Sequence, residues 1–187
     1  RNDKPVYVVS LEMPPEDIAQ RIICESHEVT SRIIRTGKID GEARRRLSEG
    51  IAAMSNLPIW WETKDTINVS RIRMTAKNLL KKGLRFIVVD YVGLMECNQG
   101  DEKRAEWERQ SNVSKGFKKL ARELKIPILC VCQLNREVDE QERPQPKHLR
   151  GSGSWEQDAH VILFIHKPEG GIIEKRREAD DKGKTRI

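Results

Sequence analysis

The sequence predicts an α/β fold, in which a mostly parallel β-sheet carries helices on both of its faces. Short runs of consecutive apolar and β-branched residues recur along the chain, as is typical of strands that are covered on both sides. Between these runs, apolar residues recur at the three- and four-residue spacing of helices. This alternation favours parallel strands joined by right-handed crossovers. With 187 residues, 37% of them hydrophobic, the chain suffices for one domain with its own core.

The predicted strands share a short, continuous apolar run and lie, in chain order, at 5–11, 58–61, 85–90, 126–132 and 160–165. Beyond Gly170, two shorter runs at 172–176 and 184–187 are joined by a charged turn and predict a C-terminal β-hairpin.

Helices are predicted after residues that favour helix starts. These are the pair Pro14 and Pro15, then Asp40, then Asn68, and a longer helical pattern covers 107–124. The charged stretches 96–104 and 136–146 predict loops that follow strands. Open parallel sheets bind their ligands at that edge.

Composition excludes several classes of protein. Lys and Arg total 35 against 29 Asp and Glu, so the net charge of +6 tolerates an acidic partner without proving one. The longest apolar stretch, 86–95, is about half of the roughly 20 residues that a bilayer requires, and Asp90 interrupts it. We therefore expect no membrane partner. The cysteines show no C-x-x-C spacing and predict free thiols in a reducing compartment: Cys24, Cys97, Cys130 and Cys132.

Polar side chains stand where three of the predicted strands end. Glu12 follows the first strand, Asp90 ends the strand at 85–90, and Gln133 follows the strand at 126–132. A carboxylate after a hydrophobic strand can bind a water molecule that coordinates Mg²⁺ beside the nucleotide phosphates. A second carboxylate can activate the attacking water. An amide side chain can contact the γ-phosphate. Taken singly, each residue also fits an ordinary turn or helix start. Taken together, Glu12, Asp90 and Gln133 favour a nucleotide hydrolase.

A phosphate-binding loop of the form G-x-x-x-x-G-K-[ST] is absent from the sequence. The Gly-Lys pairs at Gly37 and Gly183 follow no buried strand. The chain opens at Arg1, without an initiator Met and directly before a strand. We therefore expect a fragment whose phosphate loop, the Walker A element, precedes it.

Five segments carry a resemblance to a known family. They read SLEM at 10–13, IRTGKID at 34–40, FIVVDYVGLM at 86–95, CQLNRE at 132–137 and HLRGSGSWEQDAHVILFIHK at 148–167. In this order they resemble the hexameric replicative DNA helicases of the DnaB family. The similarity covers the C-terminal RecA-like motor domain, a P-loop NTPase core, over almost all of residues 1–187. It implies ATP and Mg²⁺ as cofactors.

The resemblance implies a role for each matching residue at the nucleotide. Glu12 would activate water, Asp90 would hold Mg²⁺ through water, and Gln133 would sense the γ-phosphate. The segment IIEKRR at 172–177 resembles a late strand of the family, so Lys175 and Arg177 would reach the nucleotide of the neighbouring subunit. Here Arg176 stands between them and competes for the role.

The resemblance also implies partners. Arg150, Gly151 and Gly153 fall in the loop that touches single-stranded DNA in that family, although the family usually has Glu at the position of Gly151. A homo-hexamer, a primase and a helicase loader are expected, the last two through regions outside this chain. The expected location is the cytoplasm of a bacterium, or of the bacterial host of a phage or plasmid.

The predicted function is therefore ATP-dependent translocation on single-stranded DNA and unwinding of the duplex. The alternative is a RecA-like recombinase or regulatory ATPase that binds DNA or protein without unwinding. A third possibility is a remnant that is inactive without its phosphate loop. The isolated chain is not expected to hydrolyse ATP, because phosphate binding needs that loop of backbone donors and its Lys.

Overall fold

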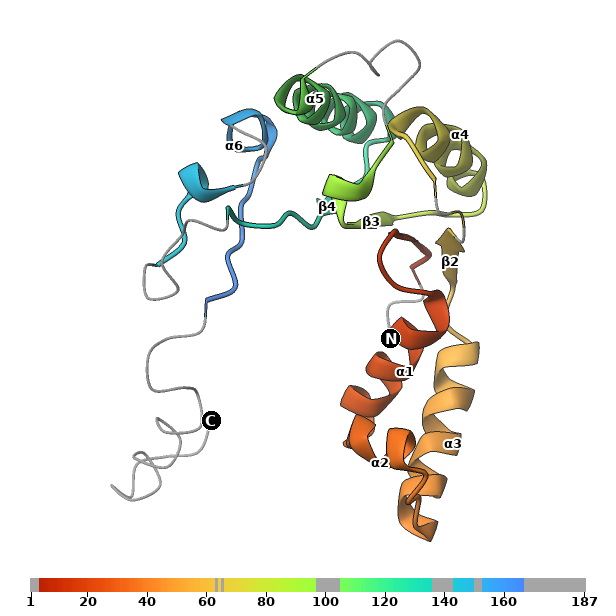
Figure 1. Ribbon diagram of the computed structural model, residues 1–187. Helices are drawn as coiled ribbons and strands as arrows, with labels where there is room; N and C mark the ends of the chain where they lie inside the picture. Colours follow the sequence, from red (N-terminus) through yellow and green to blue (C-terminus); the bar gives the residue numbers. More distant parts are fainter. Residues whose placement is uncertain are drawn as a thin grey trace, which may run out of the picture.

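The computed structural model describes residues 4–62, 64, 66–96, 105–135, 143–149 and 153–166. In this part of the chain, four strands form one sheet in the order β2-β1-β3-β4 (Figure 1). Every neighbouring pair is parallel. The strands are β1 (Val6–Ser10), β2 (Ile59–Glu62), β3 (Phe86–Asp90) and β4 (Ile128–Cys130). The predicted α/β class and the parallel sheet are confirmed.

Helices separate the strands, as the apolar spacing predicts. Between β1 and β2 lie α1 (Pro15–Ser26), α2 (Ser31–Thr36) and α3 (Gly41–Ser55). The later crossovers and the segment after β4 contain α4 (Val69–Leu80), the short 3-10 helix η1 (Val92–Leu94), α5 (Glu106–Leu124), the 3-10 helix η2 (Pro146–His148) and α6 (Gly153–Asp158). No helix in the described ranges is long and apolar enough to cross a membrane.

Two of the predicted helix starts are capped by side chains. The Asp40 carboxylate accepts a hydrogen bond from the Ala43 amide at 2.7 Å, and the Asn68 side chain accepts one from the Arg71 amide at 2.9 Å. These bonds satisfy amides that have no partner within the helix. The helix α2 was not predicted, because it is short and none of its residues is fully buried.

The core lies between one face of the sheet and helices α4 and α5. On β1 and β3 every second residue is buried, so Tyr7, Val9, Ile87 and Val89 share one face. Ile72, Ala76 and Leu79 of α4 and Phe117, Leu120 and Leu124 of α5 belong to the same buried cluster. This packing fixes the strands, and with them the residues at the strand ends.

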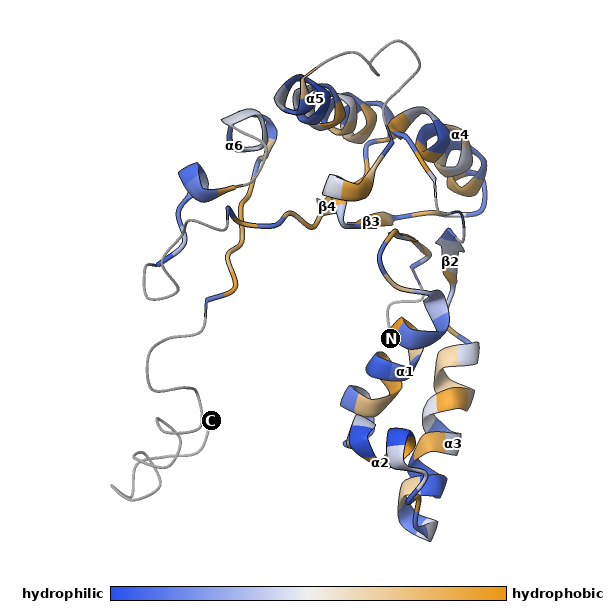
Figure 2. Ribbon diagram, viewed as in Figure 1, coloured by the Kyte–Doolittle hydropathy of each residue, from blue (hydrophilic) through white to orange (hydrophobic). Residues whose placement is uncertain are grey.

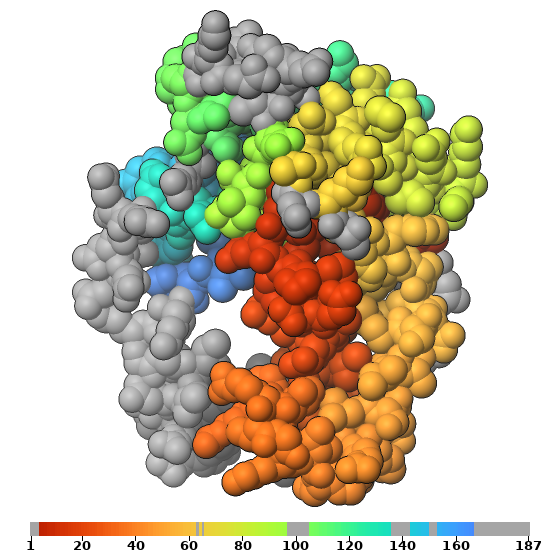
Figure 3. Space-filling model, turned by 45° about the vertical axis from the view of Figure 1, so that its right-hand side comes forward, coloured from red at the N-terminus to blue at the C-terminus, as the bar shows by residue number. Residues whose placement is uncertain are grey.

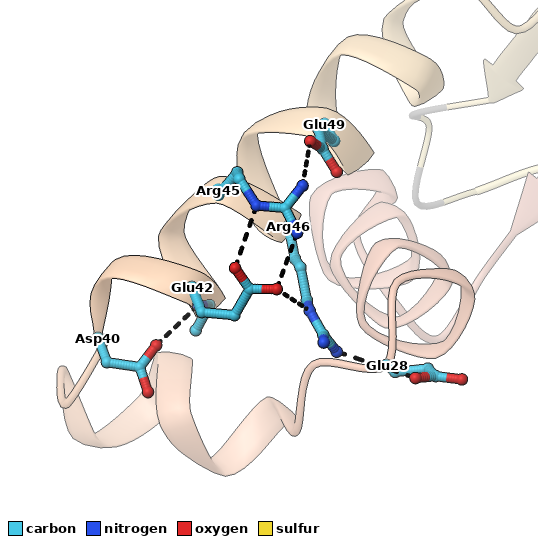
Figure 4. Close-up of polar contacts among 7 residues, drawn as sticks. Glu28, Asp40, Glu42, Arg45, Arg46 and Glu49 are labelled. Atoms are coloured by element: carbon cyan, nitrogen blue, oxygen red, sulfur yellow. Dashed lines mark hydrogen bonds and ion pairs between the residues drawn. The ribbon is translucent and has the colours of Figure 1, made fainter.

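Helices α2 and α3 each pack on α1, and the three helices form a lobe beside the sheet (Figures 1 and 3). Gly50 of α3 lies against α1, because a Cβ atom placed on it would approach the Ile23 side chain to 2.5 Å. On the surface of α3, Arg45 and Arg46 bind Glu42, and Arg45 also binds Glu49 (Figure 4). These ion pairs are exposed and contribute little to stability.

One predicted strand is wrong. Residues 160–166 are described, but they form no strand and pair with no other described segment. The segment is extended and strongly apolar (Figure 2). Ile162 and Phe164 pack against the core, whereas Val161, Leu163 and Ile165 are 74%, 81% and 99% exposed. The alternation is that of a strand, but a strand also needs a hydrogen-bonded neighbour. The predicted C-terminal hairpin lies outside the described residues.

Candidate functional site

The carboxyl ends of β1 and β3 meet at the edge predicted to bind a ligand. Asp90 is the last residue of β3, and its register partner on β1 is Ser10. One residue further, the Leu11 amide donates to the Asp90 carbonyl oxygen at 2.7 Å. Glu12 therefore emerges directly beside the end of β3. The structure brings these two carboxylate-bearing positions together from residues that are far apart in the sequence.

A side-chain contact that the sequence reasoning missed shapes the turn that carries Glu12. The Ser10 hydroxyl donates to the Met13 carbonyl oxygen at 2.8 Å and accepts from the Met13 amide at 3.3 Å. Such a turn fixes the two residues between its ends, and the Glu12 side chain is exposed on it. The available signal was a hydroxyl residue at a strand end, shortly before the helix-starting prolines.

The chain after β4 stays beside β3 and delivers Gln133 to the same edge. The Val131 amide donates to the Val89 carbonyl at 2.9 Å, and the Val131 carbonyl accepts from the Val92 amide at 3.1 Å. Gln133 follows two residues later and is exposed. Three neighbouring parallel strands thus present Glu12, Asp90 and Gln133 at one edge, as the strand pattern predicts.

Behind this edge, two cysteines act as apolar packing residues. Burial raises the pKa of the Cys130 thiol to about 12, with a smaller contribution from Cys132, and burial raises the pKa of Cys132 to about 11. Both groups are therefore neutral thiols at physiological pH, and both pack against the core. They supply neither a nucleophile nor a soft metal ligand to the site.

The donors at this edge fit a magnesium ion that takes most of its ligands from water and phosphate. Glu12 and Asp90 offer carboxylate oxygens, the hard ligands that Mg²⁺ prefers. In the described ranges, no group of three His, Cys, Asp or Glu side chains gathers to enclose a metal ion. A protein-only cage is therefore not formed by these residues. One or two carboxylates beside a nucleotide are the usual arrangement for Mg²⁺.

Of the predicted DNA loop, only Gly153 lies in the described part of the chain. It begins α6 and is exposed, and a Cβ atom added to it would meet only the Gln157 side chain, at 4.0 Å. Packing within the described residues therefore does not require a glycine here. Helix α6 is held by α5, because the Ser114 hydroxyl donates to the Asp158 carboxylate at 2.7 Å and the Lys118 ammonium donates to the Asp158 carbonyl at 2.6 Å.

The remaining predicted site residues, Arg150, Gly151, Lys175 and Arg177, and the competing Arg176, lie outside the described residues.

A hollow of about 610 Å³ lies elsewhere, along α5. Its lining residues are mostly cationic, and none of them is a strand-end residue. They are Lys115, Lys118, Lys119, Arg122, Glu123 and Asp158.

Comparisons with known proteins show relatives of this chain. The replicative DNA helicase DnaB of Geobacillus stearothermophilus is 32% identical over 172 residues, which cover 90% of this chain and 38% of that protein. The replicative DNA helicase DnaC of Bacillus subtilis is 31% identical over the same shares. This chain thus spans about two fifths of the length of these relatives.

Solved structures show the same fold. One of them, an ATPase domain, superimposes with a TM-score of 0.81 at 31% identity, covering 89% of this chain and 60% of that one. A DnaB-like replicative helicase, solved in a study of its interactions with primase, gives 0.77 at 30% identity, covering 84% of this chain and 39% of that one. The model of the DnaB-like helicase C-terminal domain family matches residues 1–187, and the chain belongs to that family.

Proposed function

We propose that this chain is the ATP-hydrolysing motor domain of a replicative DNA helicase, part of a ring that moves along single-stranded DNA and separates the duplex. The observation that carries the proposal is the meeting of Glu12, Asp90 and Gln133 at one edge of a parallel sheet, in a chain of the DnaB-like family. The phosphate-binding loop that this chemistry needs would come from residues before Arg1 in the full-length protein.

In this proposal, each strand end has a separate task. Asp90, at the end of β3, would hold Mg²⁺ through a water molecule. Glu12, on the turn fixed by Ser10, accepts the proton of the attacking water. Gln133 donates a hydrogen bond toward the γ-phosphate. Bound Mg²⁺ would neutralise the charge that develops on the phosphate oxygens.

The remaining residues would act between subunits and on DNA. Lys175 and Arg177 would complete the nucleotide site of the next subunit in a homo-hexamer. Arg150, Gly151 and Gly153 would contact the phosphates of single-stranded DNA. Primase and a helicase loader would bind through other parts of the full-length protein, which would act in the bacterial cytoplasm.

The test compares two carboxylate variants of the full-length protein with a control. Glu12→Gln removes the base but leaves the nucleotide contacts, so ATP should still bind while turnover falls by roughly 100-fold or more. Asp90→Asn should instead weaken binding of the Mg²⁺–ATP complex. Glu16 is an exposed residue in the first turn of α1, and the control substitution Glu16→Gln should leave ATP binding and ATP turnover unchanged.

The same preparations are then assayed for strand displacement on a forked duplex. Unwinding by the wild type and its loss in Glu12→Gln would support the helicase. ATP-dependent strand exchange without unwinding would contradict it and favour a recombinase. Equal loss of ATP binding in both variants would refute the division of tasks between Glu12 and Asp90.

A further inference from the structure

The chain around Gln133 is fixed at two points. Before Gln133, Val131 is tied into the sheet through its amide and its carbonyl, as described above. After Gln133, the Asn135 amide donates to the carbonyl oxygen of His148 at 2.8 Å. The second point therefore does not belong to the sheet. It depends on how firmly the backbone at His148 is itself held.

The turn that holds His148 is closed by a reciprocal pair of hydrogen bonds. The Gln145 side chain accepts from the His148 amide, which also donates to the Gln145 carbonyl oxygen at 2.9 Å, and the Gln145 amide donates to His148 Nδ1 at 3.2 Å. This pair is a capping box in which the usual Glu or Gln is replaced by His. Because Nδ1 accepts, the neutral ring carries its proton on Nε2. His148 is only 8% exposed.

The same turn is also anchored in the core. Leu149 is 8% exposed, belongs to the main buried cluster, and forms an antiparallel bridge with Leu134, the residue next to Gln133. The ring of His148 adds a side-chain hydrogen bond to the backbone hydrogen bonds of the turn. The turn places the His148 carbonyl, and that carbonyl holds the chain that leaves Gln133. These steps join groups about 15 residues apart in the sequence through contacts that lie wholly within described residues.

We infer that His148 is a positioning residue for Gln133. Its ring touches neither nucleotide nor DNA in this role. It keeps the backbone of residues 133–135 in the position from which the Gln133 side chain would reach the γ-phosphate. The inference rests on the proposed function, in which Gln133 contacts the γ-phosphate.

The test uses two substitutions of similar shape in the full-length protein. His148→Asn keeps an acceptor at the position of Nδ1, whereas His148→Leu keeps the branched shape without an acceptor. We expect His148→Leu to lower kcat for ATP by about tenfold with KM changed less than twofold, and His148→Asn to stay within twofold of wild type. His27→Leu, in the α1–α3 lobe, controls for the loss of a histidine.

A combination with Gln133→Ala separates positioning from general weakening. If His148 acts through Gln133, His148→Leu should cost less than twofold in kcat when Gln133 is already Ala. A full tenfold loss in that background, or equal activity of the Leu and Asn variants, would overturn the inference. An inactive wild type would instead count against the proposed function.

Amide hydrogen exchange tests the contact without relying on ATP turnover. The Asn135 amide, whose acceptor is the His148 carbonyl, should exchange at least tenfold faster in His148→Leu than in wild type, while the Val89 amide in the middle of the sheet stays protected. Unchanged protection at Asn135 would contradict the inference even if ATP turnover falls.

Discussion

Tyr7 and Glu62 form a polar side-chain pair that is buried within the sheet. The Tyr7 hydroxyl donates to the Glu62 carboxylate at 2.7 Å, across the neighbouring strands β1 and β2, and the two residues are 1% and 9% exposed. Burial, and next the Glu62 carboxylate, raise the pKa of Tyr7 well above its ordinary value. A buried carboxylate without a donor is costly, so this bond stabilises the edge strand.

Tyr7→Phe should therefore destabilise the protein by about 1 to 3 kcal/mol, because it leaves the Glu62 carboxylate buried without its donor. Glu62→Gln keeps an acceptor for the hydroxyl and should cost less. Urea unfolding of both variants and the wild type measures the difference. A smaller loss in Tyr7→Phe than in Glu62→Gln would show that the hydroxyl is not the donor on which Glu62 depends.

The raised pKa of Tyr7 also predicts a dependence of stability on pH. Below the ordinary tyrosine pKa of 10.0, the hydroxyl is protonated in both the folded and the unfolded state. Above it, the unfolded chain releases this proton first, so the free energy of unfolding should fall by up to about 1.4 kcal/mol per pH unit. Urea unfolding between about pH 9 and 11 should show a shallower fall in Tyr7→Phe. If the free energy of unfolding falls equally with pH in the wild type and in Tyr7→Phe, other groups cause the loss of stability at high pH.

Residues at strand ends could be predicted because a change from apolar to polar residues marks them locally. Asp90 and Gln133 follow directly from that signal. The Ser10 turn and the His148 turn could not be placed in the same way. Their contacts depend on how the backbone bends, and for His148 on a partner segment that only the folded chain brings near.

Among the helices, the α1–α3 contact shows how a single missing side chain sets the distance between two elements. Gly50→Ala would place its Cβ atom 2.5 Å from the Ile23 side chain and 3.0 Å from the His27 side chain, so these side chains or the helices must shift. This strain should outweigh the gain of about 1 kcal/mol that Ala brings to a helix interior and destabilise the protein.

The matched control is Gly41→Ala, at the start of the same helix, where an added Cβ atom meets nothing within 4 Å. Thermal unfolding should show a lower Tm for Gly50→Ala and an unchanged or higher Tm for Gly41→Ala. If both variants are equally stable, the lobe adapts freely and the close approach of α1 to α3 is not a constraint.

The prediction of elements succeeded where local pattern and packing agree. The caps at Asp40 and Asn68 start helices as expected, and the apolar runs at 5–11 and 85–90 contain strands. The run at 160–165 has the same composition but no strand beside it among the described residues. Strand pairing depends on residues far apart in the sequence. The local pattern of apolar residues therefore indicates an extended segment but does not show which strand pairs with it.

Over the whole molecule, the order of the strands brings the candidate site residues together. β1, β3 and β4 are neighbours, so their ends form one edge, although the residues between them differ widely in number. In the proposed ring, this edge is only half of a nucleotide site. The other half, with Arg177, would come from the adjacent subunit, and an Arg reaching across can raise the rate by about 10³ or more.

Mixed rings of full-length protein test this arrangement. Subunits with Arg177→Ala retain Glu12, and subunits with Glu12→Gln retain Arg177, so an interface that draws Glu12 from the first and Arg177 from the second is complete. In an equal, random mixture, roughly one interface in four is complete, and ATP turnover should recover in proportion. Native mass spectrometry must confirm that subunits have exchanged.

Arg176→Ala subunits serve as the matched control for the mixed rings. If Arg177 is the acting residue, these subunits should be active without mixing, because their own interfaces keep both Glu12 and Arg177. A mixed ring no more active than its two components would show that Arg177 does not act across the interface. Recovery with Arg176→Ala in place of Arg177→Ala would assign the role to Arg176.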